Sequence, residues 1–238
     1  MVDLIARDPR HQKPVKKAIM RVSSIVAPII LALTVTSAWA GAGTVPQQVP
    51  APQAERIPAK LPENCKLMGV FHADVDFTPQ ERQSIKTAVD TWRLQTDGLG
   101  CVLVVFDLDF HSIDILQRYQ NAHLIVKADS DTDAVRRIDL ETGGEVLGLV
   151  MPPGGVKTGQ PTRMLLIADR LHREPGQFHK VVLHELGHVL GMQHLMDSWS
   201  VMYPGYSKDQ TPGCLQDVDL NEFCRVNSCV GRHLQSCE

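Results

Sequence analysis

The sequence lacks an excess of basic charge. Its 238 residues include 24 lysines and arginines against 27 aspartates and glutamates, which gives a formal net charge of -3 at pH 7. Domains that bind nucleic acids usually carry a strongly basic face. The composition therefore argues against nucleic acid as a partner.

The sequence also lacks a bilayer-length apolar run behind its basic start. The apolar run there covers residues 25–33 and contains Pro28, whereas a helix needs about 20 residues to cross a membrane. The Ala-Trp-Ala sequence at 38–40 supplies the small-x-small pattern of a cleavage site. We therefore predict that residues 1–40 are a signal peptide and that the protein is secreted or periplasmic, without stable membrane association after cleavage. The alternative is an uncleaved anchor.

No two cysteines form a C-x-x-C pair, which argues against a zinc site built from thiolates. An even number of cysteines in an exported chain instead indicates disulfides, although the sequence alone allows fifteen pairings of six. We favour a bond between the first two cysteines and two bonds among the remaining four. The cysteines are Cys65, Cys101, Cys214, Cys224, Cys229 and Cys237.

The rest of the chain divides into a linker and one domain. Residues 41–64 are rich in proline and alanine and have no apolar periodicity, so they are predicted to be a linker. Residues 65–238 have the length of a single domain, which we expect to be catalytic with a cysteine-rich C-terminal tail.

Apolar patterns predict several strands and one well-defined helix within this domain. Strands are expected at residues 67–75, 101–106, 122–126, 146–151 and 164–169. A helix is expected to run to about residue 95, because Thr78 can cap it, Pro79 suits its first position, and Glu81 lies three residues after the cap.

Three alternating aspartates, Asp129, Asp131 and Asp133, suggest a solvated acidic loop. The spacing does not match a helix-loop-helix calcium site, since Ala134 and Leu140 stand where that loop needs glycine and glutamate. A bound Ca²⁺ ion of another kind is the alternative.

Two histidines four residues apart, His184 and His188, predict a metal site. At this spacing they lie on the same face of a helix, so both imidazoles can reach one ion. Glu185 follows the first ligand, where its carboxylate can take a proton from a metal-bound water without occupying a coordination position. The pattern therefore predicts two metal ligands and a general base.

Gly191 and His194 extend this pattern. Glycine readily adopts the left-handed conformation that ends a helix, and the reversed chain would bring His194 to the same metal ion. Three neutral imidazoles leave a fourth coordination position open for water, which is typical of catalytic zinc sites. A lone histidine is more often structural, but three at this spacing favour one catalytic Zn²⁺ ion.

The run from His184 to His194 resembles the signature of the metzincin metallopeptidases, H-E-x-x-H-x-x-G-x-x-H, at every fixed position. The Met-Tyr-Pro-x-Tyr run at 202–206 is similar to the methionine-containing turn of the matrix metalloproteinase branch. The resemblance implies an α/β (α+β) fold with a mixed, mostly parallel twisted sheet packed on helices, an active-site helix and a small C-terminal subdomain. It also implies that Met202 packs beneath the metal.

Other segments carry the same resemblance. Residues 147–154 are similar to the family's L-x-H-A-x-x-P-G segment, which forms the sheet edge above the cleft. The family histidines that bind a second, structural zinc fall on Leu149 and Ile167, so the resemblance implies only the catalytic ion. Pro204 and Tyr206 match the wall of the pocket for the residue after the scissile bond. The alternative is that Tyr206 only packs the lower subdomain.

We therefore expect a zinc metalloendopeptidase that acts on peptide or protein substrates. The alternatives are a catalytically silent, zinc-stabilised binding module and a zinc amidase acting on small substrates. Glu185 argues against the first, because a structural site needs no base. The predicted edge strand at 147–151 argues against the second, because such an edge can pair with an added peptide strand.

Overall fold

Seven strands form one mixed sheet in the computed structural model, which describes residues 3–7, 60–62, 64–109, 119–151, 155–209 and 211–237. The sheet order is β3-β2-β4-β6-β5-β1-β7. The strands are β1 (Asp3–Arg7), β2 (Leu67–Asp74), β3 (Cys101–Leu108), β4 (His123–Ala128), β5 (Val146–Met151), β6 (Arg163–Ile167) and β7 (Gly205–Tyr206). The predicted cleavage site and nearly all of the predicted linker lie outside the described residues.

The central strands confirm the predicted mostly parallel sheet. Strand β2 pairs in parallel with β3 and β4, and β4 pairs in parallel with β6. Strand β5 reverses the direction, because it runs antiparallel to β6 and to β1. The predicted strand at 164–169 ends early, at Ile167, since Ala168–Leu171 forms the short helix α4.

Helix α1 (Pro79–Gln95) begins where the sequence predicts. The Thr78 backbone N–H donates to the Glu81 carboxylate at 2.6 Å, and the Glu81 N–H donates back to the Thr78 hydroxyl at 3.3 Å. The helix buries Ile85, Ala88 and Trp92, and the Trp92 indole donates to the Leu183 carbonyl of the active-site helix at 2.9 Å. This bond links α1 to α5 (Gln177–Val189) and fixes their relative position along the helix axes.

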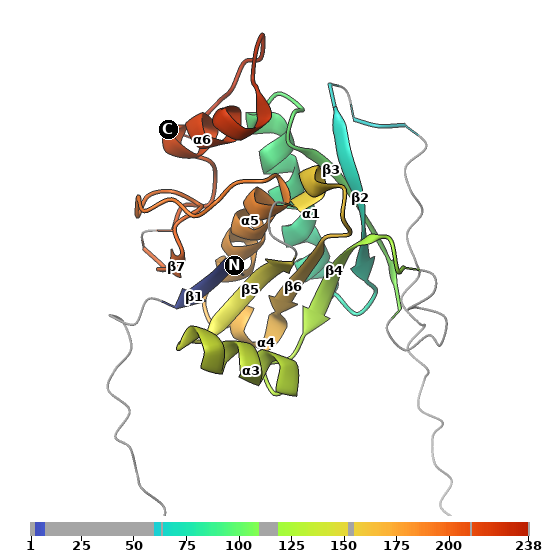
Figure 1. The fold of residues 1–238 in the computed structure, drawn as a ribbon, viewed down its shortest axis with the longest axis vertical. Coiled ribbons are helices and arrows are strands. Elements are labelled where there is room, and N and C mark those ends of the chain that lie inside the picture. Colours follow the sequence, from blue (N-terminus) through green and yellow to red (C-terminus); the bar gives the residue numbers. More distant parts are fainter. Residues whose placement is uncertain are drawn as a thin grey trace, which may run out of the picture. The chain divides into compact units, whose positions relative to one another are not determined.

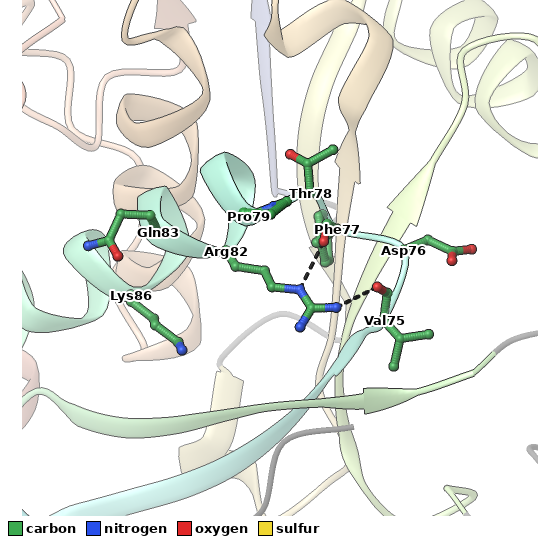
Figure 2. Close-up of a pocket in the computed structure, with 8 residues that line it drawn as sticks. All are labelled: Val75, Asp76, Phe77, Thr78, Pro79, Arg82, Gln83 and Lys86. Carbon is green, nitrogen blue, oxygen red and sulfur yellow. Dashed lines mark hydrogen bonds between the residues drawn. The ribbon is translucent and has the colours of Figure 1, made fainter. Parts of the chain in front are cut away.

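A pocket lies beside the start of α1 (Figure 2). Arg82 donates from Nε to the Phe77 carbonyl at 2.9 Å and from Nη2 to the Val75 carbonyl at 2.6 Å. Its guanidinium also lies 4.9 Å from the centre of the Phe106 ring. These contacts hold the β2–α1 connection in place, and none of the predicted site residues lines this pocket.

Helix α3 (Asp133–Thr142) was not predicted, and only Val135 along it is buried. Thr132 caps the helix by accepting from the Val135 N–H, and Gly143 ends it with a φ of 69°. The three aspartates at its start are exposed, as expected for a solvated acidic loop.

Two further helices complete the fold: α5 (Gln177–Val189) and α6 (Asp217–Asn227). Figure 1 shows α5 next to α1, with α6 nearer the C-terminal end. Side chains from α1, α5 and the sheet share one core, into which Phe223 of α6 also packs. Within the described residues, no helix is both long and apolar enough to cross a membrane.

The disulfides confirm the preferred pairing. Cys65 is bonded to Cys101, which joins the chain just before β2 to the first residue of β3. The four remaining cysteines pair among themselves, as Cys214–Cys237 and Cys224–Cys229. The tail after α6 is therefore covalently held to the helix and to the segment that precedes it.

Candidate metal centre

Helix α5 carries two of the predicted ligands in its buried C-terminal half. It begins directly after Gly176, whose φ is 75°. Phe178, Val181 and Leu186 belong to the main core. His184 and Glu185 are fully buried, and His188 is 1% exposed.

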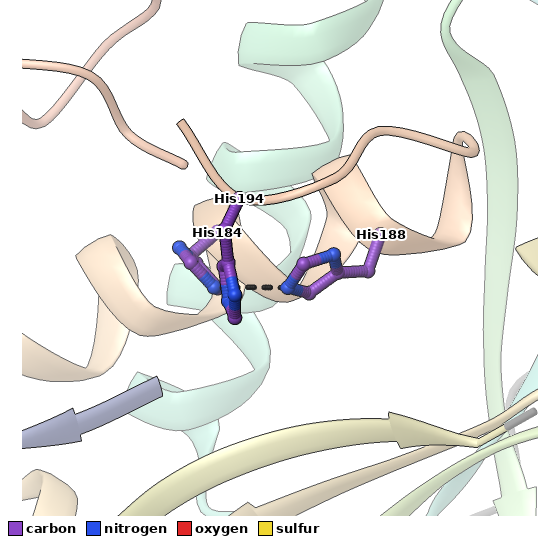
Figure 3. A group of neighbouring side chains, drawn as sticks. All are labelled: His184, His188 and His194. Carbon is purple, nitrogen blue, oxygen red and sulfur yellow. Dashed lines mark hydrogen bonds between the residues drawn. The ribbon is translucent and has the colours of Figure 1, made fainter. Parts of the chain in front are cut away.

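The turn after α5 brings in the third imidazole. Gly191 has a φ of 90°, which confirms the predicted left-handed glycine, and the Met192 N–H donates to the Gly187 carbonyl at 3.0 Å. The His194 ring centre then lies 4.8 Å from that of His188 and 5.3 Å from that of His184. One ligand nitrogen from each histidine lies within 4.8 Å of the others, and Figure 3 shows the three side chains converging.

Backbone carbonyls orient two of these rings. His184 Nδ1 lies 2.7 Å from the Val201 carbonyl, and His188 Nδ1 lies 3.0 Å from the Met192 carbonyl. If each Nδ1–H donates to its carbonyl, each Nε2 lone pair is left to face the centre of the group. The two Nε2 atoms are 3.0 Å apart. This donor set fits a zinc ion, for which neutral imidazole nitrogens are common ligands.

Electrostatics favour the neutral form that a metal requires. Burial, followed by the nearby His188 and His194, holds the pKa of His184 well below its ordinary value of 6.5. Neutral imidazole is the form that binds a metal ion, and His184 is already neutral at neutral pH.

The Glu185 carboxylate lies against the backbone of β5. A Cβ atom added to Gly148 would stand 2.8 Å from Glu185 Oε1 and 3.1 Å from its Cγ. A side chain at this position would therefore force the Glu185 carboxylate or the strand to shift. Sequence reasoning missed Gly148, although a glycine inside an apolar strand is a known sign of a close approach.

Met202 packs against α5 from the other side, as predicted. It is fully buried, and a Cβ atom added to Gly187 would stand 2.2 Å from its sulfur atom. Gly187, one of the variable positions in the histidine signature, is thus fixed by a contact that the sequence does not reveal.

Asp219 of α6 holds the methionine turn through hydrogen bonds. It is fully buried, and its carboxylate accepts from the Ser200 hydroxyl and from the Val201 and Gln216 N–H groups. Burial raises the pKa of Asp219, although these hydrogen bonds act in the opposite direction. The carbonyl of the same Val201 contacts Nδ1 of His184. Asp219 of α6 therefore helps to orient His184 through Val201.

The remaining residues implied by the family resemblance are mostly buried. Leu149 and Ile167 are fully buried. Tyr206 is 3% exposed and belongs to the main core, while Pro204 is half-buried. Among the residues that the structure describes, the histidine triad is the one group of three or more side chains gathered closely enough to hold a metal ion.

The three imidazoles on and just after α5 form a candidate site for one zinc ion. A model of the matrixin family matches residues 69–225, and the chain belongs to this family. Among solved structures, metalloproteinase-II from Bacteroides fragilis is similar, with 16% identity and a TM-score of 0.41. That match covers 71% of this chain and 55% of the other. No curated protein matches the sequence.

Proposed function

We propose that the protein is a secreted or periplasmic zinc metalloendopeptidase in which Glu185 is the general base. The observation that carries the proposal is the convergence of three imidazoles, two of them buried, on and after a helix that also carries the fully buried Glu185. Membership of the matrixin family supports peptide-bond hydrolysis. Glu185 favours this function over a silent zinc-stabilised module, which would have no use for a base.

His184, His188 and His194 would hold the zinc ion. Bound zinc would polarise the scissile carbonyl and lower the pKa of a water molecule to about 7. Glu185 would accept the proton of the attacking water on a carboxylate oxygen and deliver it to the leaving nitrogen. The Gly148 backbone confines that carboxylate beneath β5, which limits the positions it can take.

The predicted edge strand at 147–151 is an interior strand of the sheet, because β5 pairs with β6 on one side and with β1, from residues 3–7, on the other. Once the predicted signal peptide is removed, β5 would offer that second, antiparallel edge to an extended peptide rather than to a small amide. Backbone pairing of this kind supplies affinity for any extended chain, while side-chain pockets supply selectivity. An amidase acting on small substrates would make no use of such an edge.

The disulfides support export. All six cysteines are paired, and such bonds persist in oxidising compartments such as the periplasm or the extracellular space. The predicted signal peptide accounts for delivery there.

Metal analysis combined with cleavage-site profiling tests the function. The purified chain should hold about one zinc per molecule and should cut a denatured proteome at internal peptide bonds. A strong chelator should abolish cleavage, and added zinc should restore it. Full activity after exhaustive chelation would overturn the zinc assignment, and cleavage of small amides alone would favour the amidase.

A further inference from the structure

The end of α6 supports the turn that leads from α5 to the third histidine. Asn227, the last residue of α6, donates from Nδ2 to the Leu190 carbonyl at 3.1 Å, across 37 residues of sequence. Leu190 is the residue at which α5 ends. Carbonyls in the last turn of a helix have no partner within the helix and need one from outside. The Asn227 amide therefore caps the active-site helix from a distant segment.

The same turn fits closely between two other side chains. A Cβ atom added to Gly191 would stand 3.1 Å from Lys157 Cδ and 3.3 Å from Val226 Cγ1. Lys157 belongs to the short 3-10 helix η2 (Gly155–Thr158), and its Nζ donates to the Val226 carbonyl. The end of α6 is thus held against the turn by a second contact beside the Asn227 amide.

A disulfide restrains the backbone on both sides of Asn227. The bond joins Cys224 and Cys229, five residues apart, and so encloses Val226 and Asn227. Inside this ring the Ser228 N–H donates to the Cys224 carbonyl at 2.9 Å. Ser228 has a φ of 57°, a conformation that residues other than glycine rarely adopt. The covalent ring therefore limits where the Asn227 side chain can point.

The supported turn carries groups that two of the predicted ligands need. The Met192 carbonyl lies 3.0 Å from Nδ1 of His188, and His194 follows Met192 by two residues. A displacement of the turn would change the orientation of the His188 ring and the position of His194 together. Groups that orient metal ligands in this way raise the affinity of the site.

We propose that Asn227 is a positioning residue of the metal centre and that the Cys224–Cys229 bond keeps its amide in place. This role rests on the zinc site of the proposed function and extends it to α6, which supplies none of the predicted ligands. Asn227 acts through the Leu190 carbonyl and not on the metal ion. It reduces the movement that the turn can make before zinc binds.

Three substitutions in the full-length chain test the role of the amide. Asn227→Leu removes the donor with little change in size, and Asn227→Gln keeps an amide. Asn221→Leu, on the exposed side of the same helix, is the matched control. In competition with a chromogenic chelator, we expect Asn227→Leu to raise the zinc dissociation constant about tenfold. Asn227→Gln should recover most of this loss, and Asn221→Leu should bind as the parent does.

Hydrogen exchange in the zinc-free chain locates the effect. The amides at 190–192 should exchange about tenfold faster in Asn227→Leu, because local opening depends on local contacts. The amides of α1 should exchange at the parent rate. Equal exchange at 190–192 in parent and variant would overturn the proposal. An equal loss of affinity in Asn227→Gln and Asn227→Leu would also overturn it, because packing would then account for the effect.

Replacing both cysteines of the ring by serine tests the role of the disulfide. The Cys224→Ser/Cys229→Ser chain should also lose about tenfold in zinc affinity, and Asn227→Leu should add little to that loss, because groups that act through one contact are not additive. Losses that multiply to about a hundredfold would show that the bond acts independently of Asn227. The single Asn227 variants keep the bond, so they decide the role of the amide even where the serine chain unfolds.

The measurements on the parent chain separate this inference from the proposed function. A parent chain that bound no zinc would overturn the proposed function, while exchange at 190–192 would still test whether Asn227 holds the turn. A parent chain that bound zinc, with an Asn227→Leu variant that bound it equally tightly, would overturn the inference alone.

Discussion

Two buried glutamates in this chain have different surroundings. Glu81 is 1% exposed and Glu185 is fully buried, and each lies near at least one histidine. The Glu81 carboxylate accepts from the Thr78 N–H at 2.6 Å and from Lys127 Nζ at 2.9 Å, and lies 2.8 Å from His172 Nε2. Glu185 instead belongs to α5, the helix that carries His184 and His188. Its carboxylate lies against Gly148 of β5.

This difference shows that burial of a carboxylate does not by itself indicate catalysis. The neighbours of Glu81 are a helix N-terminus and a cation, which together stabilise a permanent charge. Glu185 directly follows the predicted metal ligand His184 on α5, and in the proposed mechanism it accepts a proton.

Gly187→Ala should disturb the packing of Met202 against the active-site helix. Alanine ordinarily stabilises a helix interior by about 1 kcal/mol relative to glycine. Here its Cβ would stand 2.2 Å from the Met202 sulfur, and overpacking of this kind costs roughly 1–3 kcal/mol. We expect a net loss of stability in denaturant unfolding and a lower zinc content.

Gly213→Ala is the matched control, because no atom lies within 4 Å of the added Cβ there. If both alanine variants unfold at the same denaturant concentration as the parent, the packing of Met202 against α5 does not constrain this site.

Glu81→Gln should reduce stability without reducing the activity of folded protein. Burial alone would raise the pKa of Glu81, but hydrogen bonds with His172, Lys127 and Thr78 outweigh it, and the pKa lies below the ordinary value of 4.5. A group with a lowered pKa stabilises the fold above its unfolded pKa, and that contribution is lost as the pH falls through the folded value. The variant should lose roughly 1–3 kcal/mol at pH 7.

Unfolding curves for parent and variant at several pH values test this account. Their difference should narrow below about pH 4.5, where the parent also loses the charge. Glu141→Gln, on the exposed side of α3, serves as the control and should be neutral. A difference that widened in acid would show that Glu81 is held in its protonated form.

The smallest expected effect concerns the residue after the scissile bond. If Pro204 and Tyr206 line its pocket, burial favours an apolar side chain by about 0.8 kcal/mol per methylene, so leucine should exceed alanine roughly tenfold. Cleavage sites should therefore be enriched in Leu, Ile, Met or Phe there. Tyr206 is buried in the core, and a profile dominated by charged residues at that position would favour the packing role.

The three histidines of the metal centre could be predicted more easily than the residues that pack around them, because the histidine signature is local in sequence. The helix, the left-handed Gly191 and the return of His194 all follow from rules that act within one or two turns of chain. The capping residues Thr78 and Glu81 obey rules of the same range.

Gly187 and Gly148 could not be assigned from the sequence, because each is determined by an atom from a distant segment. Asp219 likewise acts through Val201, 18 residues away. Helix α3 was missed although Thr132 and Gly143 mark its ends by local rules, whereas β1 depends entirely on pairing with strands far along the chain. The fold class was therefore predictable, whereas these tertiary contacts were not.

The central claim is that coordination and proton transfer belong to different residues of α5. The most direct measurement compares zinc content and peptide cleavage for Glu185→Gln and His188→Ala. The account predicts that Glu185→Gln retains about one zinc per chain and loses at least about a hundredfold in turnover, while His188→Ala loses both. A Glu185→Gln protein that still cleaves peptides at the parent rate would contradict it.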